Sequence, residues 1–314
     1  MATSGVSTFT MTARQVINKA FGKIGVKTAE QELQPDEYQD GQDTLNLMIK
    51  AWGAQGLHLW CKEEGLLFLD AGKSNYNLGL TGDEACELDD FIGTETTAAY
   101  VATDTVIEVT STAGMVAADY SGIELNDNTR HWSTIVTVDS ATQITIAGGL
   151  PSKSKLGSTV FTFTNLIERP NRILSYRRKT YGNDNEIPVS SLSRDSYFNQ
   201  VNKLQQGTVV NCYYSPQLGN GVAYVWQTAS SVNDLLRFTY ERPLEDIVIG
   251  DDNVDFPVEW LESIIYNLAA RLTDDYNVPL PKADRIAQKA AFLLDELLGW
   301  DQEMESIYLQ PDFD

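Results

Sequence analysis

Cysteine and histidine are scarce in this sequence, and their spacing excludes several kinds of site. The 314 residues include three cysteines, Cys61, Cys86 and Cys212, and two histidines, His58 and His131. The cysteines form no CxxC pair and lie too far apart to indicate a disulfide framework, and the histidines do not stand at metal-ligand spacing. We therefore expect no metal and no cofactor, and we interpret both residue types as packing or surface residues.

Long apolar runs are also missing. No stretch approaches the roughly 20 apolar residues that a membrane-spanning helix needs. The first ten residues, MATSGVSTFT, have neither the charged nor the apolar region of a secretion signal. We therefore expect a soluble chain that is not exported and has no membrane partner.

Positive charge is in short supply. The chain has 44 acidic and 23 basic residues, which gives a formal net charge of -21. A surface of this sign repels DNA phosphates except where cations cluster. The composition therefore argues against a dedicated DNA-binding protein.

Enzyme motifs are absent as well. The sequence contains no GxSxG, no P-loop, no GxGxxG in a strand context and no HExxH. Neighbouring acids such as Glu63 and Glu64 suggest a glycosidase pair, but accidental pairs are inevitable among 44 acidic residues. We predict no catalytic residues, and we keep a cell-wall-degrading, muramidase-like enzyme as an alternative.

Helical patterns occur at both ends of the chain. Thr12 and Gln15 form a capping box that opens a first helix, and a second helix begins near Pro35. Two further amphipathic helices are expected over residues 256–276 and from Lys282, and their alanines and leucines favour an antiparallel pair.

Strand patterns fill the region between these helices. Residues 83–167 are rich in Thr, Val, Ala and Gly, with short alternating runs between turn residues, which predicts an all-β sandwich or barrel. More strands follow, with one short helix predicted over 193–207. We therefore predict an α+β fold, in which helix pairs from both ends surround a mostly antiparallel strand set. The predicted main body spans 1–82 and 168–300, interrupted by the inserted module at 83–167, and 301–314 form a separate C-terminal arm.

Six segments outside the β module occur in a distinctive order. They are DTLNLMIKAWGAQGLHLW, YNLG, ERPNRILSYRR, SRDSYFNQVNKLQQGTVVNCYY, FTYERPLEDI and FPVEWLESIIYNLAARLTDDY. In this order the chain resembles the head-to-tail adaptor family of short-tailed bacteriophages, also described as packaged-DNA stabilisation or tail accessory proteins. The segments are packing signatures and not catalytic motifs. Simpler members join YNLG to the next strand almost directly, so the role of the inserted module does not carry over.

The resemblance implies a structural virion protein of the neck and tail, assembled in the host cytoplasm. It implies a homo-oligomeric ring of twelve subunits beneath the portal protein, in contact with tail nozzle or tail fibre proteins. Double-stranded DNA would pass through this ring without sequence-specific binding. An acidic lining suits such a channel, because carboxylates repel the duplex and allow it to slide.

Two groups of residues are candidates for contacts in such an assembly. The strongest basic cluster consists of Arg169, Arg172, Arg177, Arg178 and Lys179. Because alternate residues of a strand point to opposite faces, these cations do not form one patch, and we favour contacts with carboxylates of neighbouring subunits or the portal over contacts with DNA.

The second group lies in the C-terminal segment, where acids are not balanced by any Lys or Arg. Its apolar residues are Trp300, Met304, Ile307, Tyr308, Leu309 and Phe313. They are too apolar for a merely solvated tail, and we expect them to dock on the portal. The alternative is that the segment folds onto its own body.

Three aromatic residues of the β module carry the last hypothesis. Tyr100, Tyr120 and Trp132 suggest a sugar-stacking platform, which would make the module a glycan-binding adhesion or decoration domain. We favour the alternative that these residues belong to the core of the module.

Overall fold

The structure is a computed structural model that describes residues 9–27, 32–54 and 59–300. The fold is α+β, as the sequence predicts, with helices at both ends of the chain and strands between them. The chain divides into two compact units, residues 1–60 with 244–314 and residues 61–243. We call them the helical unit and the β unit.

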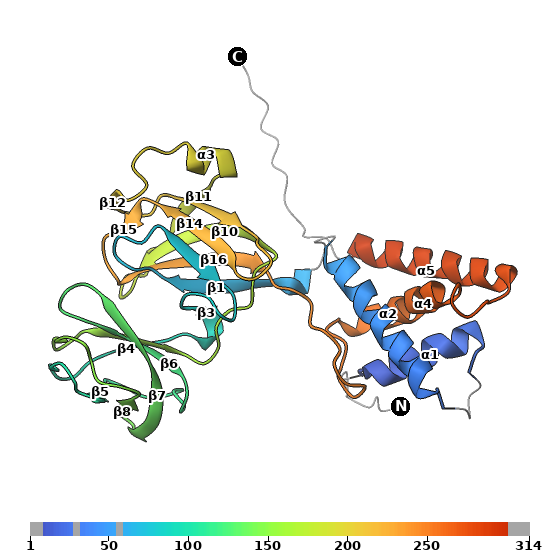
Figure 1. The fold of residues 1–314 in the computed structure, drawn as a ribbon, viewed down its shortest axis with the longest axis horizontal. Coiled ribbons are helices and arrows are strands. Elements are labelled where there is room, and N and C mark those ends of the chain that lie inside the picture. Colours follow the sequence, from blue (N-terminus) through green and yellow to red (C-terminus); the bar gives the residue numbers. More distant parts are fainter. Residues whose placement is uncertain (1–8, 28–31, 55–58, 301–314) are drawn as a thin grey trace, which may run out of the picture. The chain divides into compact units, whose positions relative to one another are not determined.

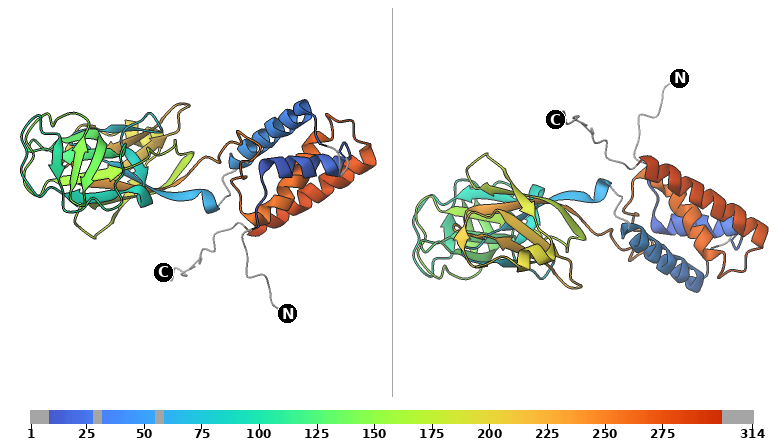
Figure 2. Two further views of the ribbon diagram at one scale, coloured as in Figure 1. Left: turned by 90° about the horizontal axis from the view of Figure 1, so that it is seen from below. Right: turned by 90° about the horizontal axis from the view of Figure 1, so that it is seen from above.

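In the described part of the helical unit there are four α-helices, two from each end of the chain (Figure 1). They are α1 (Ala13–Ile24), α2 (Pro35–Gly53), α4 (Leu261–Leu272) and α5 (Leu280–Trp300). Figure 2 shows the blue N-terminal helices beside the orange and red C-terminal helices. Helix α4 packs against all three others, which explains why Ile264, Leu268 and Leu272 are fully buried. None of the helices in the described ranges is long and apolar enough to cross a membrane.

An aromatic cluster joins α2 to the turn before α4. Trp260 ends a 3-10 turn (Val258–Trp260), and its ring lies 5.8 Å from Trp52 and 5.3 Å from Trp60. Phe256 completes the cluster at 5.9 Å from Trp52. Large rings in edge contact bury much apolar area, so this cluster is a main stabilising feature of the helical unit.

The β unit contains an eight-stranded sheet. Its strands, in spatial order, are β2 (Asn75–Leu78), β14 (Gly221–Trp226), β13 (Asn211–Ser215), β11 (Ile187–Ser191), β10 (Arg172–Thr180), β16 (Asp234–Glu241), β1 (Lys62–Phe68) and β3 (Ala85–Glu87). All neighbours are antiparallel except β11 and β13, which run parallel. A separate parallel pair is formed by β12 (Gln206–Gly207) and β15 (Thr228–Ala229).

A six-stranded sheet lies within the predicted module. Its order is β4 (Ile92–Glu95), β9 (Thr159–Phe163), β6 (Tyr120–Glu124), β7 (Arg130–Ser140), β8 (Gln143–Ile146) and β5 (Val106–Glu108). The two edge strands approach each other through a bridge between Thr96 and Val109, so the sheet nearly closes into a barrel. Its interior holds apolar residues such as Ile107, Ile123 and Ile144, each fully buried.

The two sheets pack together through an aromatic core. Phe68 of β1 stacks on Phe163 of β9, with ring centroids 5.5 Å apart, and Phe161 and Leu235 belong to the same cluster. Arg130 crosses this junction. Because the contact is apolar at its centre, the nearly closed sheet is firmly attached to the larger sheet.

Two short elements differ from or add to the prediction. The helix predicted over 193–207 is only five residues long, α3 (Arg194–Phe198), and Gly207 belongs to β12. Ser193 accepts a hydrogen bond from the Ser196 backbone, which starts the helix, but the residues beyond Phe198 continue as turns that lead into β12. Two 3-10 turns, Leu59–Cys61 and Leu88–Asp90, flank β1 and β3.

Candidate functional site

The cations of β10 contact carboxylates within the β unit. Arg172 forms an ion pair with Glu241 at 2.6 Å, and Arg177 pairs with Glu64. Lys179 lies 3.9 Å from Asp184, which is fully exposed. The register with β16, which shifts between Ile173 and Ser175, places these three cations on the same face of the sheet.

The remaining two residues of the predicted cluster lie apart from this row. Arg169 precedes β10 and donates a hydrogen bond to the Gln217 carbonyl at 3.4 Å. Arg178 is half-buried, and strand alternation places it on the opposite face from Arg177 and Lys179. Whether any of the five contacts another protein stays a prediction.

A charged strip runs across three strands on one face of the eight-stranded sheet. It consists of Glu64, Arg177, Lys179, Glu186 and Arg237. Arg177 stands directly opposite Arg237 in the register of β10 and β16, and both pair with Glu186. Like charges directly opposite each other destabilise a sheet, so the two carboxylates compensate the arginine pair.

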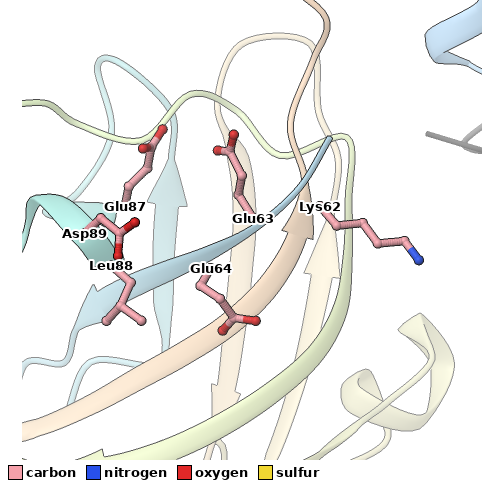
Figure 3. Close-up of a pocket in the computed structure, with 6 residues that line it drawn as sticks. All are labelled: Lys62, Glu63, Glu64, Glu87, Leu88 and Asp89. Carbon is pink, nitrogen blue, oxygen red and sulfur yellow. The ribbon is translucent and has the colours of Figure 1, made fainter. Parts of the chain in front are cut away.

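An acidic pocket lies beside this strip (Figure 3). It has a volume of about 330 Å³ and is lined by Lys62, Glu63, Glu64, Glu87, Leu88 and Asp89. Figure 3 shows the carboxylates of Glu63 and Glu87 directed to the same side, whereas Glu64 points the other way.

Glu63 and Glu87 form a coupled pair in this pocket. Glu63 accepts hydrogen bonds from Arg242 Nε at 2.7 Å and from the Tyr240 hydroxyl at 3.1 Å. Partial burial raises the pKa of Glu87, and the nearby negative charges of Glu63 and Asp90 raise it further.

The pocket can bind a proton or a cationic side chain. A carboxyl group with a raised pKa beside a second carboxyl group also occurs at sites of acid catalysis. Within the described ranges, no group of three or more His, Cys, Asp or Glu is arranged to hold a metal ion. The acids before α4 serve the backbone: Asp252 accepts hydrogen bonds from the amides of Val248 and Ile249 at 2.9 and 2.7 Å.

Of the predicted C-terminal contact residues, one lies within the described part of the chain. Trp300 is the last residue of α5. Met304, Ile307, Tyr308, Leu309 and Phe313 lie outside the described residues, as does His58. His131 is half-buried, and burial lowers its pKa.

The three aromatic residues considered for sugar stacking pack inside the β unit. Tyr120 stacks on Phe163 at 4.9 Å, and Trp132 lies 5.0 Å from Phe68. Tyr100 is buried and its hydroxyl accepts a hydrogen bond from the Glu108 backbone at 2.6 Å. These contacts favour the interpretation of the three rings as core residues.

Comparisons with known proteins were made for the whole chain. Neither a protein-family model nor a curated protein matched it.

Sequence reasoning missed Glu87, which lines the acidic pocket, and it missed Glu186 and Arg237, which belong to the charged strip. Glu87 faces Gly65 across β1 and β3, and Arg237 faces Arg177 across β10 and β16. These neighbours are set by strand pairing between distant segments. Local patterns therefore gave no signal for them, beyond the alternation of each strand.

Proposed function

We propose that this protein is a structural, non-enzymatic head-to-tail adaptor of a short-tailed bacteriophage. Copies of the chain form a ring, for which we propose twelve subunits, that joins the portal protein to the tail nozzle or fibre proteins. DNA passes through the ring without sequence-specific binding. The protein acts in the neck and tail of the virion.

The packing of the helical unit carries the proposal. The two longest helical segments of the resemblance lie far apart in the sequence, one in α2 and one around α4. In the structure they meet through Trp52, Trp60, Phe256 and Trp260. Two of the segments that resemble the adaptor family therefore build a common core, which supports their interpretation as one framework of packing.

Charge also supports a passive role toward DNA. The net charge is -21, and the cations Arg172 and Arg177 of β10 are paired with Glu241 and Glu64. Paired cations are less available to phosphates, so a strong multi-phosphate grip is not expected from this strand. Copies that repeat one heterologous contact close into a ring if the rotation between them allows it.

Electron microscopy of the purified protein mixed with the portal protein of the same phage tests the proposal. We expect rings attached to one end of the portal. The proposal fails if the folded protein forms no ring with the portal and no complex with it in size-exclusion chromatography.

The docking of the C-terminal arm is tested by deleting residues 301–314. We propose that Trp300 with Met304, Ile307, Tyr308, Leu309 and Phe313 contacts the portal. The truncated chain should keep its melting temperature but lose portal binding. A clear fall in melting temperature would instead indicate that the arm packs on its own chain, and unchanged portal binding would refute docking.

The coupled carboxyls Glu63 and Glu87 are the one observation that favours a muramidase-like enzyme as a second candidate. A peptidoglycan-clearing assay with Glu87→Gln separates the two functions. The adaptor proposal predicts no clearing by either protein. Clearing by the wild type that Glu87→Gln abolishes, with an unchanged melting temperature, would establish the enzyme. Binding of host glycans by the protein would favour the adhesion alternative.

A further inference from the structure

A second pocket lies in the β unit between the eight-stranded sheet and the segment around β4. Its volume is about 470 Å³, within the range of ordinary ligand sites. One wall is apolar, with Leu66, Phe91 and Leu235, and another carries Lys179 and Arg237. We call it the amphipathic pocket.

The apolar wall is continuous with the aromatic core between the sheets. Leu66 and Leu235 are 1% and 3% exposed and belong to the cluster that contains Phe68 and Phe163, against which Phe91 also packs. Leu66 and Leu235 are thus already shielded from water, and a large apolar side chain that enters the pocket would bury mainly its own surface and that of half-buried Phe91.

The cationic wall is incompletely neutralised. The side chains of Arg177, Lys179 and Arg237 are 33%, 28% and 21% exposed, whereas only two carboxylates of the charged strip, Glu64 and Glu186, are similarly buried. Asp184 lies outside the strip, is fully exposed and is 3.9 Å from Lys179, so it neutralises little of the charge of that lysine. This half-buried group thus contains one more cation than carboxylates.

Hydrogen bonding shows the same deficit of acceptors. The Nε atoms of Arg177 and Arg237 are buried, and neither has a hydrogen-bond partner among the described residues. The two residues stand directly opposite each other in the strand register. An additional carboxylate beside this wall would relieve the repulsion between the two arginines.

We propose that the amphipathic pocket binds a partner protein through an acidic and aromatic side-chain pair. The aromatic ring packs on Leu66, Phe91 and Leu235, and the neighbouring carboxylate pairs with Lys179 and Arg237. Two further lining residues, Glu95 and Asp184, are exposed acids. They disfavour polyanions such as DNA or free phosphate, so a single carboxylate on an apolar group fits best. This inference does not depend on the adaptor function.

The proposal is tested by measuring the binding of short peptides to the full chain with ligand-observed NMR. The probe is N-acetyl-Asp-Phe-amide, and its neutral match is N-acetyl-Asn-Phe-amide. We expect the Asp peptide to bind about tenfold more tightly, which corresponds to one charge-assisted hydrogen bond in a partly exposed site. Inorganic phosphate should not compete with the peptide.

Lys179→Met should abolish most of this preference, and Arg237→Met provides a second variant if the first alters folding. Lys155→Met is the matched control, because Lys155 is an exposed lysine that pairs with Glu124 at 3.7 Å and does not line the pocket. Equal binding of the two peptides, an unchanged preference in folded Lys179→Met and Arg237→Met, or absence of binding would overturn the proposal.

Discussion

Replacement of Arg130 tests how the two sheets of the β unit are held together. The residue is 9% exposed, and its side chain donates hydrogen bonds to the Gly122 carbonyl of β6 at 2.9 Å, and to Val232 O and Asn233 Oδ1 in the turn before β16 at 2.9 and 3.0 Å. Its guanidinium also lies over the ring of Phe161 at 3.8 Å. Burial lowers the pKa of Arg130 to about 9, which still leaves it charged at neutral pH.

Arg130→Met keeps a side chain of similar length but removes every donor. Each lost charge-assisted bond costs about 1.5–3 kcal/mol. Part of this cost is returned, because a buried cation is itself expensive to desolvate. We expect a net loss of about 3 kcal/mol, which lowers the melting temperature of a unit of this size by roughly 6–12 °C.

Differential scanning calorimetry of Arg130→Met and Arg194→Met measures the effect. Arg194 is an exposed arginine of α3 in the same unit, so its replacement controls for the loss of one positive charge. Arg130→Lys should lie between wild type and Arg130→Met, since one ammonium group cannot replace a planar fork. Equal melting temperatures for Arg130→Met and Arg194→Met would refute the reasoning.

Two further predictions concern packing and pH. A Cβ atom at Gly41 would lie 2.7 Å from Ile17 Cγ2 and 2.9 Å from a ring carbon of Phe21, so Gly41→Ala should destabilise the helical unit by about 1–3 kcal/mol in urea denaturation. Gly22→Ala, where nothing lies within 4 Å, should stabilise it by about 0.5–1 kcal/mol, and the same sign for both variants would contradict the packing argument. The pKa of Glu87 is raised in the folded state, so the folded protein binds this proton more tightly than the unfolded chain does. The resulting stabilisation is present below the ordinary glutamate pKa of 4.5 and is lost as the pH rises just above that value. Glu87→Gln should therefore reduce the fall of stability with rising pH in that window, by less than about 1 kcal/mol since the group is exposed; parallel pH profiles of the two proteins would refute the assignment.

The helices could be predicted because their signals are local. The predicted start at Thr12 is confirmed by α1, whose N-terminus has a hydrogen bond from the Thr12 amide to Gln15 Oε1 at 3.3 Å. Pro35 is the first residue of α2, as predicted. Caps and apolar periodicity involve residues within a few positions of each other, so one sequence suffices to find them.

The candidate site could be predicted only in part. The row of cations on β10 was visible, but its partners Glu64, Glu186 and Glu241 come from three other segments. A register of strands is decided by long-range packing, and a shift by one residue would turn each of these side chains to the other face. The junction at Arg130 was missed for the same reason.

The aromatic cluster of the helical unit also determines when that unit can form. Trp52 and Trp60 are synthesised long before Phe256 and Trp260, and the whole β unit separates them along the chain. During translation, residues 61–243 emerge as one continuous stretch and are free to fold while α1 and α2 still lack α4 and α5. The two N-terminal helices must therefore keep their apolar faces exposed until the last quarter of the chain leaves the ribosome, which makes this waiting period the stage most vulnerable to aggregation.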